Sequence, residues 1–583
     1  MADLDQRIRY LTDEYPEWTR RTIAGHFDHV AELFADRVFI CIPDREYTYA
    51  EIQKSSRLVA KGLLSLGIRP REHVAMLVGN YPEFVIFKLA LARIGAVAVP
   101  LNMLLTEREI SFSLDDSDAI AVLFNDRLGR QDYIKIMNSL FPEAIEPGEP
   151  DKIPAFSRFP KIRNLICFSP TGESYPGFMN FESLYDLAAS VSEEELKKVQ
   201  ESNCYPDDIF DIMYTSGTTA MPKGAMLSHD MCLRGVYATC ITRATGDGTR
   251  FYSPLPFNHI FAWNYVILAA SFVGGAAITH PQFLVSQAFE LIEKYRANEV
   301  VCVPSMLLPL VNYPEIDAFD LKHLTSVFCA ATPAPLPLWQ RAKEVLKLDN
   351  LTTAYGLTEG GGMVTVSYPG ESDKIVSTRI GRMMAPNCSG LPEFGWRNHQ
   401  LKVVDPVSLK DLPRGMEGEL VCRGNVVIRG YYKRPEVNQE TIDKDGWLRT
   451  GDLVIWDEDG LFQFTGRSKE IYKTHGENVI PKEIEEVLST HPKVNQVYVV
   501  GIPYPVAGDV GAAFIELKPG EKATRREIVR FCRENMAKFK IPRYMFFITA
   551  SELPFTATGK IKKYKLVEYA KQLLKDNDQS ESE

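Results

Sequence analysis

The sequence predicts an α/β protein: a large N-terminal domain of two layered αβ subdomains plus a β subdomain, followed by a small α+β C-terminal domain. Three observations lead to this prediction. Strand-like and helix-like segments alternate from Val38 and again from Asp208, a pattern typical of parallel sheets covered by helices. After about residue 400, short β-rich segments separated by Gly- and Asp-rich turns replace the alternation. A chain of 583 residues is also longer than one hydrophobic core normally serves.

The first alternating region is clearest between residues 57 and 99. Residues 57–66 carry apolar side chains at helical spacing, and Gly67 can end that helix. Residues 73–78 form an apolar run of strand length, Pro82 opens the next helix, and residues 96–99 form a second strand. This strand–helix–strand spacing predicts parallel pairing, because parallel neighbours need a crossover between them.

The second alternating region begins at Asp208, and we expect its strands near residues 209–214, 276–279, 299–303 and 326–330. Polar residues and glycines interrupt the apolar tract at 262–278, so we expect a core helix with a turn there and no membrane-spanning segment. The last block again mixes helices and strands. We therefore place the N-terminal domain at residues 1–468 and the C-terminal domain at residues 469–583.

Charge and cysteine content bear on the class of protein. The net charge is -10 and the pI is near 5.7, which argues against a broad basic surface for nucleic acid or anionic membranes. A local basic pocket for an anionic ligand is still compatible with this charge. The ten cysteines are scattered without a C-x-x-C pair, which suits buried thiols in a reducing cytoplasm. The N-terminus lacks a secretory signal pattern, so we expect a cytoplasmic protein.

The clearest chemical signal is the run Tyr214-Thr215-Ser216-Gly217-Thr218-Thr219-Ala220-Met221-Pro222-Lys223-Gly224, which follows the apolar residues 209–213. Its hydroxyls and backbone N–H groups can face an anion, and the lysine adds a point charge. This pattern favours polyphosphate binding. It differs from the common mononucleotide loop because Pro222 precedes the lysine. A short fragment of this composition is equally typical of a surface turn.

Five further motifs follow this loop along the chain. Each one alone has an ordinary explanation, such as a turn, a helix cap, a core histidine or a solvated lysine. They are Phe257-Asn258-His259-Ile260-Phe261, Tyr355-Gly356-Leu357-Thr358-Glu359, Thr450-Gly451-Asp452, Gly466-Arg467-Ser468-Lys469-Glu470 with Lys473 and Gly476, and Pro554-Phe555-Thr556-Ala557-Thr558-Gly559-Lys560. In order and spacing, the loop and these motifs together resemble the adenylate-forming superfamily: acyl-CoA synthetases, luciferases and the adenylation domains of peptide synthetases. Ala220 stands where that superfamily more often has glycine.

The resemblance implies a role for each motif. Tyr355 stacks on adenine, Thr358 contacts the α-phosphate, and Glu359 holds Mg²⁺, a hard dication that prefers oxygen ligands. The carboxylate of Asp452 accepts hydrogen bonds from both ribose hydroxyls. The triphosphate would be bound by residues of the phosphate loop: Thr215, Ser216, Gly217, Thr218, Thr219 and Lys223. Ala331 and Thr332 would line the adenine side, Arg467 would bind the ribose and phosphate, and Gly356 and Lys473 would contact the cofactor. The resemblance also implies passage of the pantetheine arm at Gly476, a hinge at Lys469 and a catalytic lysine at Lys560.

The reaction implied by the resemblance has two steps. A carboxylic acid attacks ATP to give an acyl adenylate and pyrophosphate, and the acyl group then passes to the thiol of coenzyme A after the mobile C-terminal domain rotates about Lys469. ATP, Mg²⁺ and coenzyme A are the expected cofactors, and a homodimer is compatible with the sequence. Three alternatives stay open: loading of a carrier-protein pantetheine, luciferase-type oxidation, and a non-catalytic nucleotide- or acyl-binding protein.

Two positions bear on which acid is used. Asn258 and His259 follow Phe257, where amino-acid-activating relatives carry an Asp that pairs with the α-ammonium group. In relatives, an aromatic residue at the position of His259 gates the carboxylate pocket. Gly356 stands where acetate-using relatives have a Trp that shortens the pocket. We therefore expect a medium or long fatty acid, or a cyclic or aromatic acid, rather than acetate or an amino acid.

Overall fold

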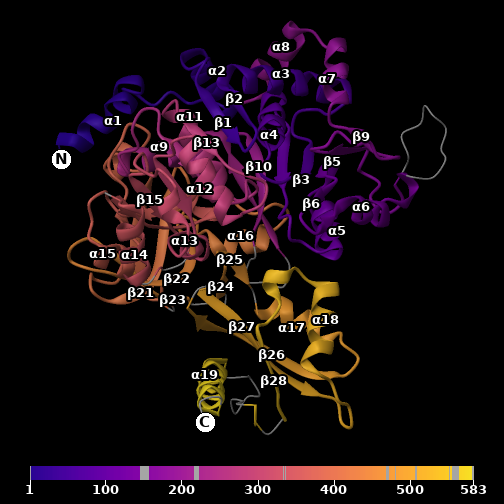
Figure 1. Ribbon diagram of the computed structural model, residues 1–583, viewed down its shortest axis with the longest axis vertical. Helices are drawn as coiled ribbons and strands as arrows, with labels where there is room; N and C mark the ends of the chain where they lie inside the picture. Colours follow the sequence, from indigo (N-terminus) through magenta and orange to yellow (C-terminus); the bar gives the residue numbers. More distant parts are fainter. Residues whose placement is uncertain are drawn as a thin grey trace. The chain divides into compact units, whose positions relative to one another are not determined.

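The structure is a computed structural model that describes residues 2–144, 156–215, 222–331, 334, 336–348, 350–406, 408–467, 472–479, 481–505, 508–549, 552–553 and 563–580. The chain forms two compact units. The first unit comprises residues 1–103, 113–214 and 224–466, and the second comprises residues 104–112, 215–223 and 467–583. The predicted fold class is confirmed: layered α/β sheets and a smaller β sheet make up the first unit, and an α+β sheet makes up the second (Figure 1).

One seven-stranded sheet of the first unit is parallel except for its last strand. Its order is β16 (Asn350–Thr352), β15 (Ser326–Cys329), β14 (Glu299–Cys302), β12 (Arg250–Tyr252), β13 (Ala276–Ile278), β1 (Val38–Ile42) and the antiparallel β2 (Arg45–Thr48). Successive residues along these strands enter two different cores. Val301 and Phe328 belong to the larger core, whereas Val300 and Val327 belong to a second core on the other face. Both faces of the sheet are therefore covered.

The second seven-stranded sheet carries the phosphate-loop motif. Its order is β11 (Lys223–Ser228), β10 (Ile209–Thr215), β4 (Val97–Pro100), β3 (His73–Leu77), β5 (Ala119–Asn125), β8 (Asn164–Phe168) and β9 (Met179–Asn180). The pairs from β10 to β9 are parallel, as the alternation predicted. Gly67 adopts the positive φ of 81° that favours glycine just after the helix at Tyr49–Ser65.

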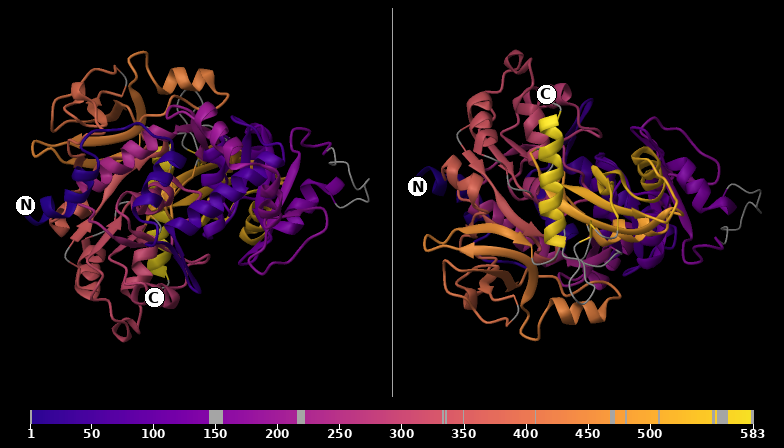
Figure 2. Two further views of the ribbon diagram at one scale, coloured as in Figure 1. Left: turned by 90° about the horizontal axis from the view of Figure 1, so that it is seen from above. Right: turned by 90° about the horizontal axis from the view of Figure 1, so that it is seen from below.

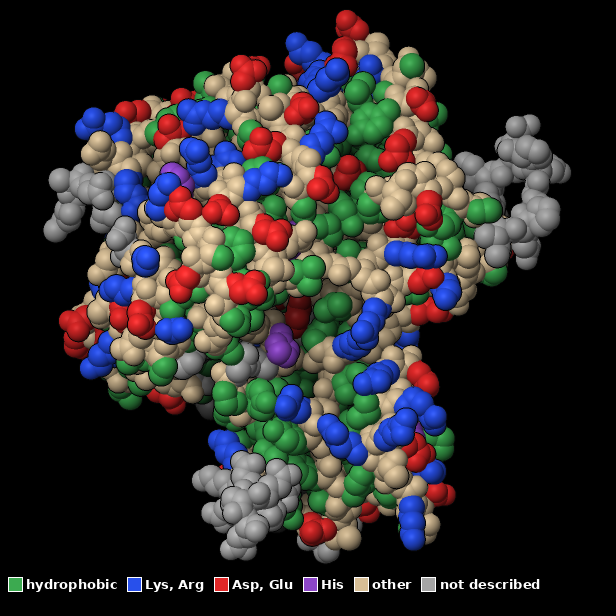
Figure 3. Space-filling model, viewed as in Figure 1, with side chains coloured by type: hydrophobic (Ala, Val, Ile, Leu, Met, Phe, Trp, Pro, Cys, Tyr) green, Lys and Arg blue, Asp and Glu red, His purple; other side chains and the backbone are tan. Residues whose placement is uncertain are grey.

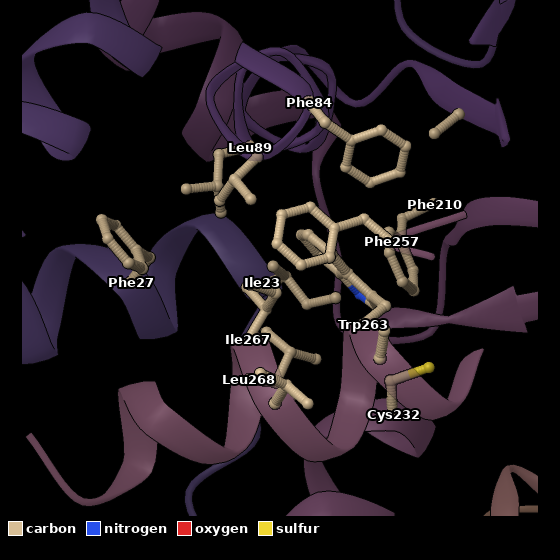
Figure 4. Close-up of a cluster of buried hydrophobic side chains, with 14 of the residues drawn as sticks. Ile23, Phe27, Phe84, Leu89, Phe210, Cys232, Phe257, Trp263, Ile267 and Leu268 are labelled. Atoms are coloured by element: carbon tan, nitrogen blue, oxygen red, sulfur yellow. The ribbon is translucent and has the colours of Figure 1, made fainter. Parts of the chain in front are cut away.

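The larger core joins helices to both seven-stranded sheets. Figure 4 shows its centre, where Phe84, Phe210, Phe257 and Trp263 lie close together with Cys232. Helices of the first unit are α1 (Ala2–Glu14), α2 (Ile23–Leu33), α3 (Tyr49–Ser65), α4 (Pro82–Ile94), α6 (Tyr133–Leu140), α7 (Ser183–Leu187), α8 (Glu193–Asn203), α9 (His229–Thr242), α10 (Ile260–Ala262), α11 (Ala269–Phe272), α12 (Val285–Lys294), α13 (Pro304–Val311), α14 (Leu336–Leu346), α15 (Asp373–Thr378) and α16 (Pro435–Thr441). Helix α5 (Glu107–Asp116) spans the boundary between the units.

The apolar tract at 262–278 forms a buried helical segment followed by a turn, as its sequence predicts, but part of that helix is π-helical. Its helical part contains a π-helical stretch, η3 (Trp263–Leu268), between α10 and α11, and the tract ends in strand β13. The side chains of η3 are buried in the larger core. Among the described residues, no helix has both the length and the apolarity needed to span a membrane.

Two antiparallel sheets complete the first unit. A three-stranded sheet contains β17 (Ala354–Leu357), β18 (Gly362–Val366) and β19 (Arg382–Met383), and a four-stranded sheet contains β20 (His399–Val404), β21 (Glu417–Gly424), β22 (Leu448–Trp456) and β23 (Phe462–Arg467). Their shared apolar core includes Tyr355, Val364 and Leu420. On the face shown in Figure 3, acidic and basic side chains are interspersed over the first unit.

The second unit is built on a five-stranded sheet. Its order is β25 (Glu477–Val479), β24 (Tyr472–Thr474), β27 (Gly508–Leu517) and β26 (Val494–Tyr504), with β28 (Tyr544–Phe547) paired to β27. Val499 faces a core with α17 (Pro481–Ser489) and α18 (Arg525–Asn535), whereas Val500 faces a core with α19 (Lys563–Ser580). Figure 2 shows α19 lying across one face of the sheet. Helices thus cover both of its faces.

Candidate active site

Tyr355 and Asp452 form a buried pair across two sheets. The Tyr355 hydroxyl, on β17, donates a hydrogen bond of 2.6 Å to Oδ2 of Asp452, on β22. The two residues are 7% and 6% exposed. Burial, together with the neighbouring Asp452 carboxylate, raises the pKa of Tyr355 well above its ordinary value, so its hydroxyl remains a donor. The pair places the ring that is predicted to stack on adenine next to the carboxylate that is predicted to bind the ribose diol.

Thr358 and Glu359 lie in the short turn that joins β17 to β18. Both are half-buried, and the turn is a single 3₁₀ helix, η5 (Thr358–Gly360). The Tyr431 hydroxyl donates to Oε1 of Glu359 at 2.8 Å, and the Ile428 N–H donates to the Glu359 carbonyl at 3.0 Å. The carboxylate of Glu359 is thus held by a side chain from a distant loop, which the sequence analysis did not identify.

The surroundings of Glu359 fit Mg²⁺ bound together with a nucleotide. Among the described residues, no group of three His, Cys, Asp or Glu side chains converges as a metal cage would. Mg²⁺ is commonly held by one or two carboxylates plus substrate phosphates rather than by an all-protein cage. A single oriented carboxylate on a turn of the predicted nucleotide site matches that mode of binding.

Gly356 is required by the close approach of its own hairpin. A Cβ atom at this position would lie 1.9 Å from the Gly362 carbonyl oxygen and 2.9 Å from the Cα atom of Met363. Both atoms belong to the backbone, so a side chain would force β17 and β18 apart. From the sequence, Gly356 is expected to leave room for the acid. The close approach of β17 and β18 is a separate, steric reason for glycine at this position.

His259 caps the short helix α10. Its Nδ1 atom accepts a hydrogen bond of 3.1 Å from the Phe261 N–H. The preceding loop is held by Asn80, whose Nδ2 donates to the Leu255 carbonyl at 2.8 Å and whose Oδ1 accepts from the Phe257 N–H at 2.9 Å. The predicted gate residue therefore sits on a fixed loop. The only sequence signal for Asn80 is a polar residue between a strand and a helix.

Ala331 adopts a backbone conformation that normally favours glycine. Its φ is +76°, two residues after the end of strand β15. A non-glycine residue in this region carries strain of about 1 kcal/mol or more. Ala331 is predicted to line the adenine side, and its backbone there adopts a conformation that would suit glycine.

Several predicted site residues lie on strands or in the turns between them. Thr215 ends β10, and Lys223 opens β11 and is buried. The backbone of Arg467 ends β23. Lys473 lies on β24, and Gly476 lies in the tight turn to β25, with a φ of 85° that glycine adopts without strain.

Other predicted site residues fall outside the described part of the chain. They are Ser216, Gly217, Thr218, Thr219, Thr332, Lys469 and Lys560. Their roles, and the role of the Arg467 side chain, stay predictions.

Comparisons with known proteins show the family to which the chain belongs. Residues 27–432 match the AMP-binding enzyme family, and residues 483–560 match the AMP-binding enzyme C-terminal domain. A putative acyl-CoA synthetase of Bacillus subtilis is 34% identical over 556 residues, which cover 95% of this chain and 97% of that protein. The mitochondrial medium-chain acyl-CoA ligase of Danio rerio is 30% identical over 573 residues, covering 97% and 88% of the two chains.

Solved structures share the fold over nearly the whole chain. The amide bond synthetase McbA from Marinactinospora thermotolerans has a TM-score of 0.76 at 24% identity, covering 93% of this chain and 99% of that one. A Mycobacterium tuberculosis fatty acyl CoA synthetase has a TM-score of 0.64 at 25% identity, covering 94% and 98%.

The chain therefore belongs to the AMP-binding enzyme family. It is an enzyme of the AMP-forming acid–thiol ligase class, as its motifs predicted.

Proposed function

We propose that this protein converts a medium- or long-chain fatty acid, or a cyclic or aromatic acid, to its acyl-CoA thioester through an acyl adenylate. The observation that carries this proposal is the buried Tyr355–Asp452 pair, whose tyrosine lies on the hairpin that also bears Glu359. It supports a site for the adenosine part of ATP beside an oriented carboxylate. ATP, acid and coenzyme A are the substrates.

The first step demands charge stabilisation more than covalent chemistry. A carboxylate and a triphosphate are both anions, and charge develops on the α-phosphoryl oxygens as they react. Preorganised positive and hydrogen-bonding groups are then the largest source of catalysis. Thr358 and Lys223 supply such groups, and Glu359 would hold Mg²⁺. When bound, that ion neutralises phosphate charge.

The choice of acid rests on the loop before α10 and on the relatives. His259 and Asn258 lack the carboxylate that would pair with an amino acid's ammonium group. The Danio rerio relative is named for medium-chain acyl groups. We expect octanoate and longer fatty acids to be activated faster than acetate, and benzoate tests the aromatic class.

The thiol step depends on two residues that the structure does not describe, Lys469 and Lys560. Lys560 would stabilise adenylation, and the C-terminal domain, residues 469–583, would then rotate about Lys469 so that Gly476 lines the pantetheine path. We expect Lys560→Ala to abolish adenylation while largely sparing thioester formation from supplied acyl adenylate. A proline at Lys469 should mainly slow thiolysis. Equal loss of both half-reactions in Lys560→Ala would refute the alternation.

One experiment tests the whole proposal. Pyrophosphate release is measured with a panel of acids, with and without coenzyme A, and acyl-CoA is detected directly. Multiple turnovers that require coenzyme A support the proposal. Stoichiometric adenylate without turnover on coenzyme A would favour a carrier-protein acceptor, and no pyrophosphate with any acid would favour a non-catalytic binding protein.

We further propose a reducing, cytoplasmic location, supported by ten cysteines of which none forms a disulfide. A homodimer stays a prediction for sedimentation or light scattering to test, as does the domain division at residue 468.

A further inference from the structure

Tyr431 joins the predicted Mg²⁺ ligand to the strand that follows the phosphate loop. It is 6% exposed, and its hydroxyl donates to Oε1 of Glu359 at 2.8 Å across a sequence separation of 72 residues. Its backbone forms an antiparallel bridge with Ala225, just inside β11. One residue thus contacts both the carboxylate and the strand that begins at Lys223.

Backbone hydrogen bonds on either side of Tyr431 strengthen this junction. The Met226 N–H donates to the Gly430 carbonyl at 3.2 Å, and the Tyr432 N–H donates to the Gly224 carbonyl at 2.8 Å. These bonds fix the position of the Tyr431 Cα atom relative to β11. The direction of its ring then decides where the hydroxyl lies.

The residues after Tyr431 anchor the same loop to the end of α5 and the turn that follows it. The Tyr432 hydroxyl donates to Asp118 at 2.7 Å, and Arg434 pairs with Asp116 at 2.6 Å. Asp116 also accepts from the hydroxyl of Tyr214, at 2.9 Å, near the end of β10. The loop is therefore bonded to β11 directly and to β10 through the shared partner Asp116.

The turn that carries Glu359 is fixed from the other side as well. The Gly360 carbonyl lies 2.9 Å from Nε2 of the buried His399, and the Gly361 carbonyl accepts from Asn264 of η3 at 3.3 Å. With the turn backbone held in this way, the orientation of the Glu359 carboxylate depends on its side-chain contacts. The hydrogen bond from the Tyr431 hydroxyl is one of these contacts.

We propose that Tyr431 is a positioning residue that orients the Glu359 carboxylate for the metal–nucleotide complex. The proposal rests on the function proposed above. Hydrogen-bond partners of a ligating carboxylate hold it in the binding orientation, and removing them typically weakens metal binding by about 10- to 100-fold. The proposed role belongs to the hydroxyl of Tyr431. Tyr431→Phe removes this hydroxyl and keeps the ring and the backbone, so the variant tests the hydroxyl alone.

The test compares Tyr431→Phe with a matched control, Tyr432→Phe. Both remove one hydroxyl from the same loop, but Tyr432 bonds to Asp118 rather than to Glu359. Mn²⁺ binding to the full-length protein with α,β-methylene-ATP is measured by electron paramagnetic resonance. Mg²⁺ dependence of acid-dependent pyrophosphate release is measured in parallel.

We expect Tyr431→Phe to weaken Mn²⁺ binding about 10-fold and to raise the half-saturating Mg²⁺ concentration by a similar factor. The KM for the acid should stay unchanged, and Tyr432→Phe should behave like the unsubstituted protein. Unchanged Mn²⁺ binding in Tyr431→Phe, or equal weakening in both variants, would overturn the proposal. So would a failure of the unsubstituted protein to bind Mn²⁺ with the nucleotide. Normal Mn²⁺ binding without pyrophosphate from any acid would instead count against the proposed function alone.

Discussion

The ion pair between Lys88 and Asp211 provides the sharpest test of how the first unit is stabilised. Lys88, on α4, lies 2.6 Å from Oδ2 of Asp211, on β10, and both side chains are fully buried. The Lys88 ammonium lies 4.1 Å from the centre of the ring of Trp263, one of the clustered aromatic residues labelled in Figure 4. We expect Lys88→Met to destabilise this unit strongly.

The size of the effect follows from burial. At 2.6 Å and an effective dielectric constant of about 20, the gross attraction is about 6 kcal/mol. Most of this offsets the cost of removing two charges from water. Burial raises the pKa of Asp211 to about 6 even with Lys88 beside it. Removing the lysine alone leaves that cost uncompensated, and breaking such a pair typically costs about 3–5 kcal/mol.

Two further variants separate this mechanism from simple loss of packing. Lys88→Met combined with Asp211→Val removes both charges and should recover to within about 1–2 kcal/mol of the unsubstituted protein. Lys197→Met removes an exposed lysine that pairs with Glu201 and should change stability by less than about 1 kcal/mol. Because a chain with two units need not unfold in one step, the transitions should be resolved by calorimetry and urea titration.

The pH dependence gives an independent check on Lys88→Met. Without the lysine, the pKa of buried Asp211 rises further above its ordinary value. The folded state then binds a proton that the unfolded state has released, so this contribution is lost as pH rises through the folded pKa. The destabilisation should therefore be smaller near pH 5 than near pH 8. A loss below about 1 kcal/mol, or a double variant less stable than Lys88→Met, would refute the reasoning.

Three further predictions concern protonation and the site. Burial lowers the pKa of His26 and His229 to about 3 and that of His399 to about 4. The stability that each neutral histidine contributes is therefore present above about pH 6.5 and is lost as pH falls toward 4. The free energy of unfolding should fall by up to about 1.4 kcal/mol per pH unit for each histidine. Urea titrations between about pH 7.5 and pH 5 should show this slope, and a flat profile would contradict neutral burial. Tyr355→Phe removes the hydroxyl that donates to Asp452 at 2.6 Å, and it should raise the KM for ATP about 10-fold or more with little change in the KM for the acid. Initial rates measure both constants. Equal changes in the two KM values would count against an adenosine site. Gly356→Ala should lower the midpoint of thermal unfolding and the activity with every acid, because the added Cβ atom would meet the Gly362 carbonyl. A stable variant that only prefers shorter acids would show that the hairpin tolerates a side chain.

The pattern of apolar residues predicted several strands of the two seven-stranded sheets. The segments expected near 299–303 and 326–330 form Glu299–Cys302 and Ser326–Cys329. Such strands are predictable because a buried parallel strand needs a nearly continuous apolar run, whatever lies beside it. The tract at 262–278 was less predictable. Its helix contains the π-helical stretch η3, whose Asn264 reaches the Gly361 carbonyl, and apolar periodicity carries no information about that partner.

The sequence by itself determined the class of chemistry, because the motifs that contain Tyr355, Glu359 and Asp452 resemble those of one superfamily in order and spacing. Only the tertiary structure decided how these groups are held. Tyr431 lies 72 residues from Glu359, and Asn80 lies 177 residues from Phe257. Hydrogen bonds between such distant residues leave no local spacing in the chain, because folding rather than sequence neighbourhood brings the partners together.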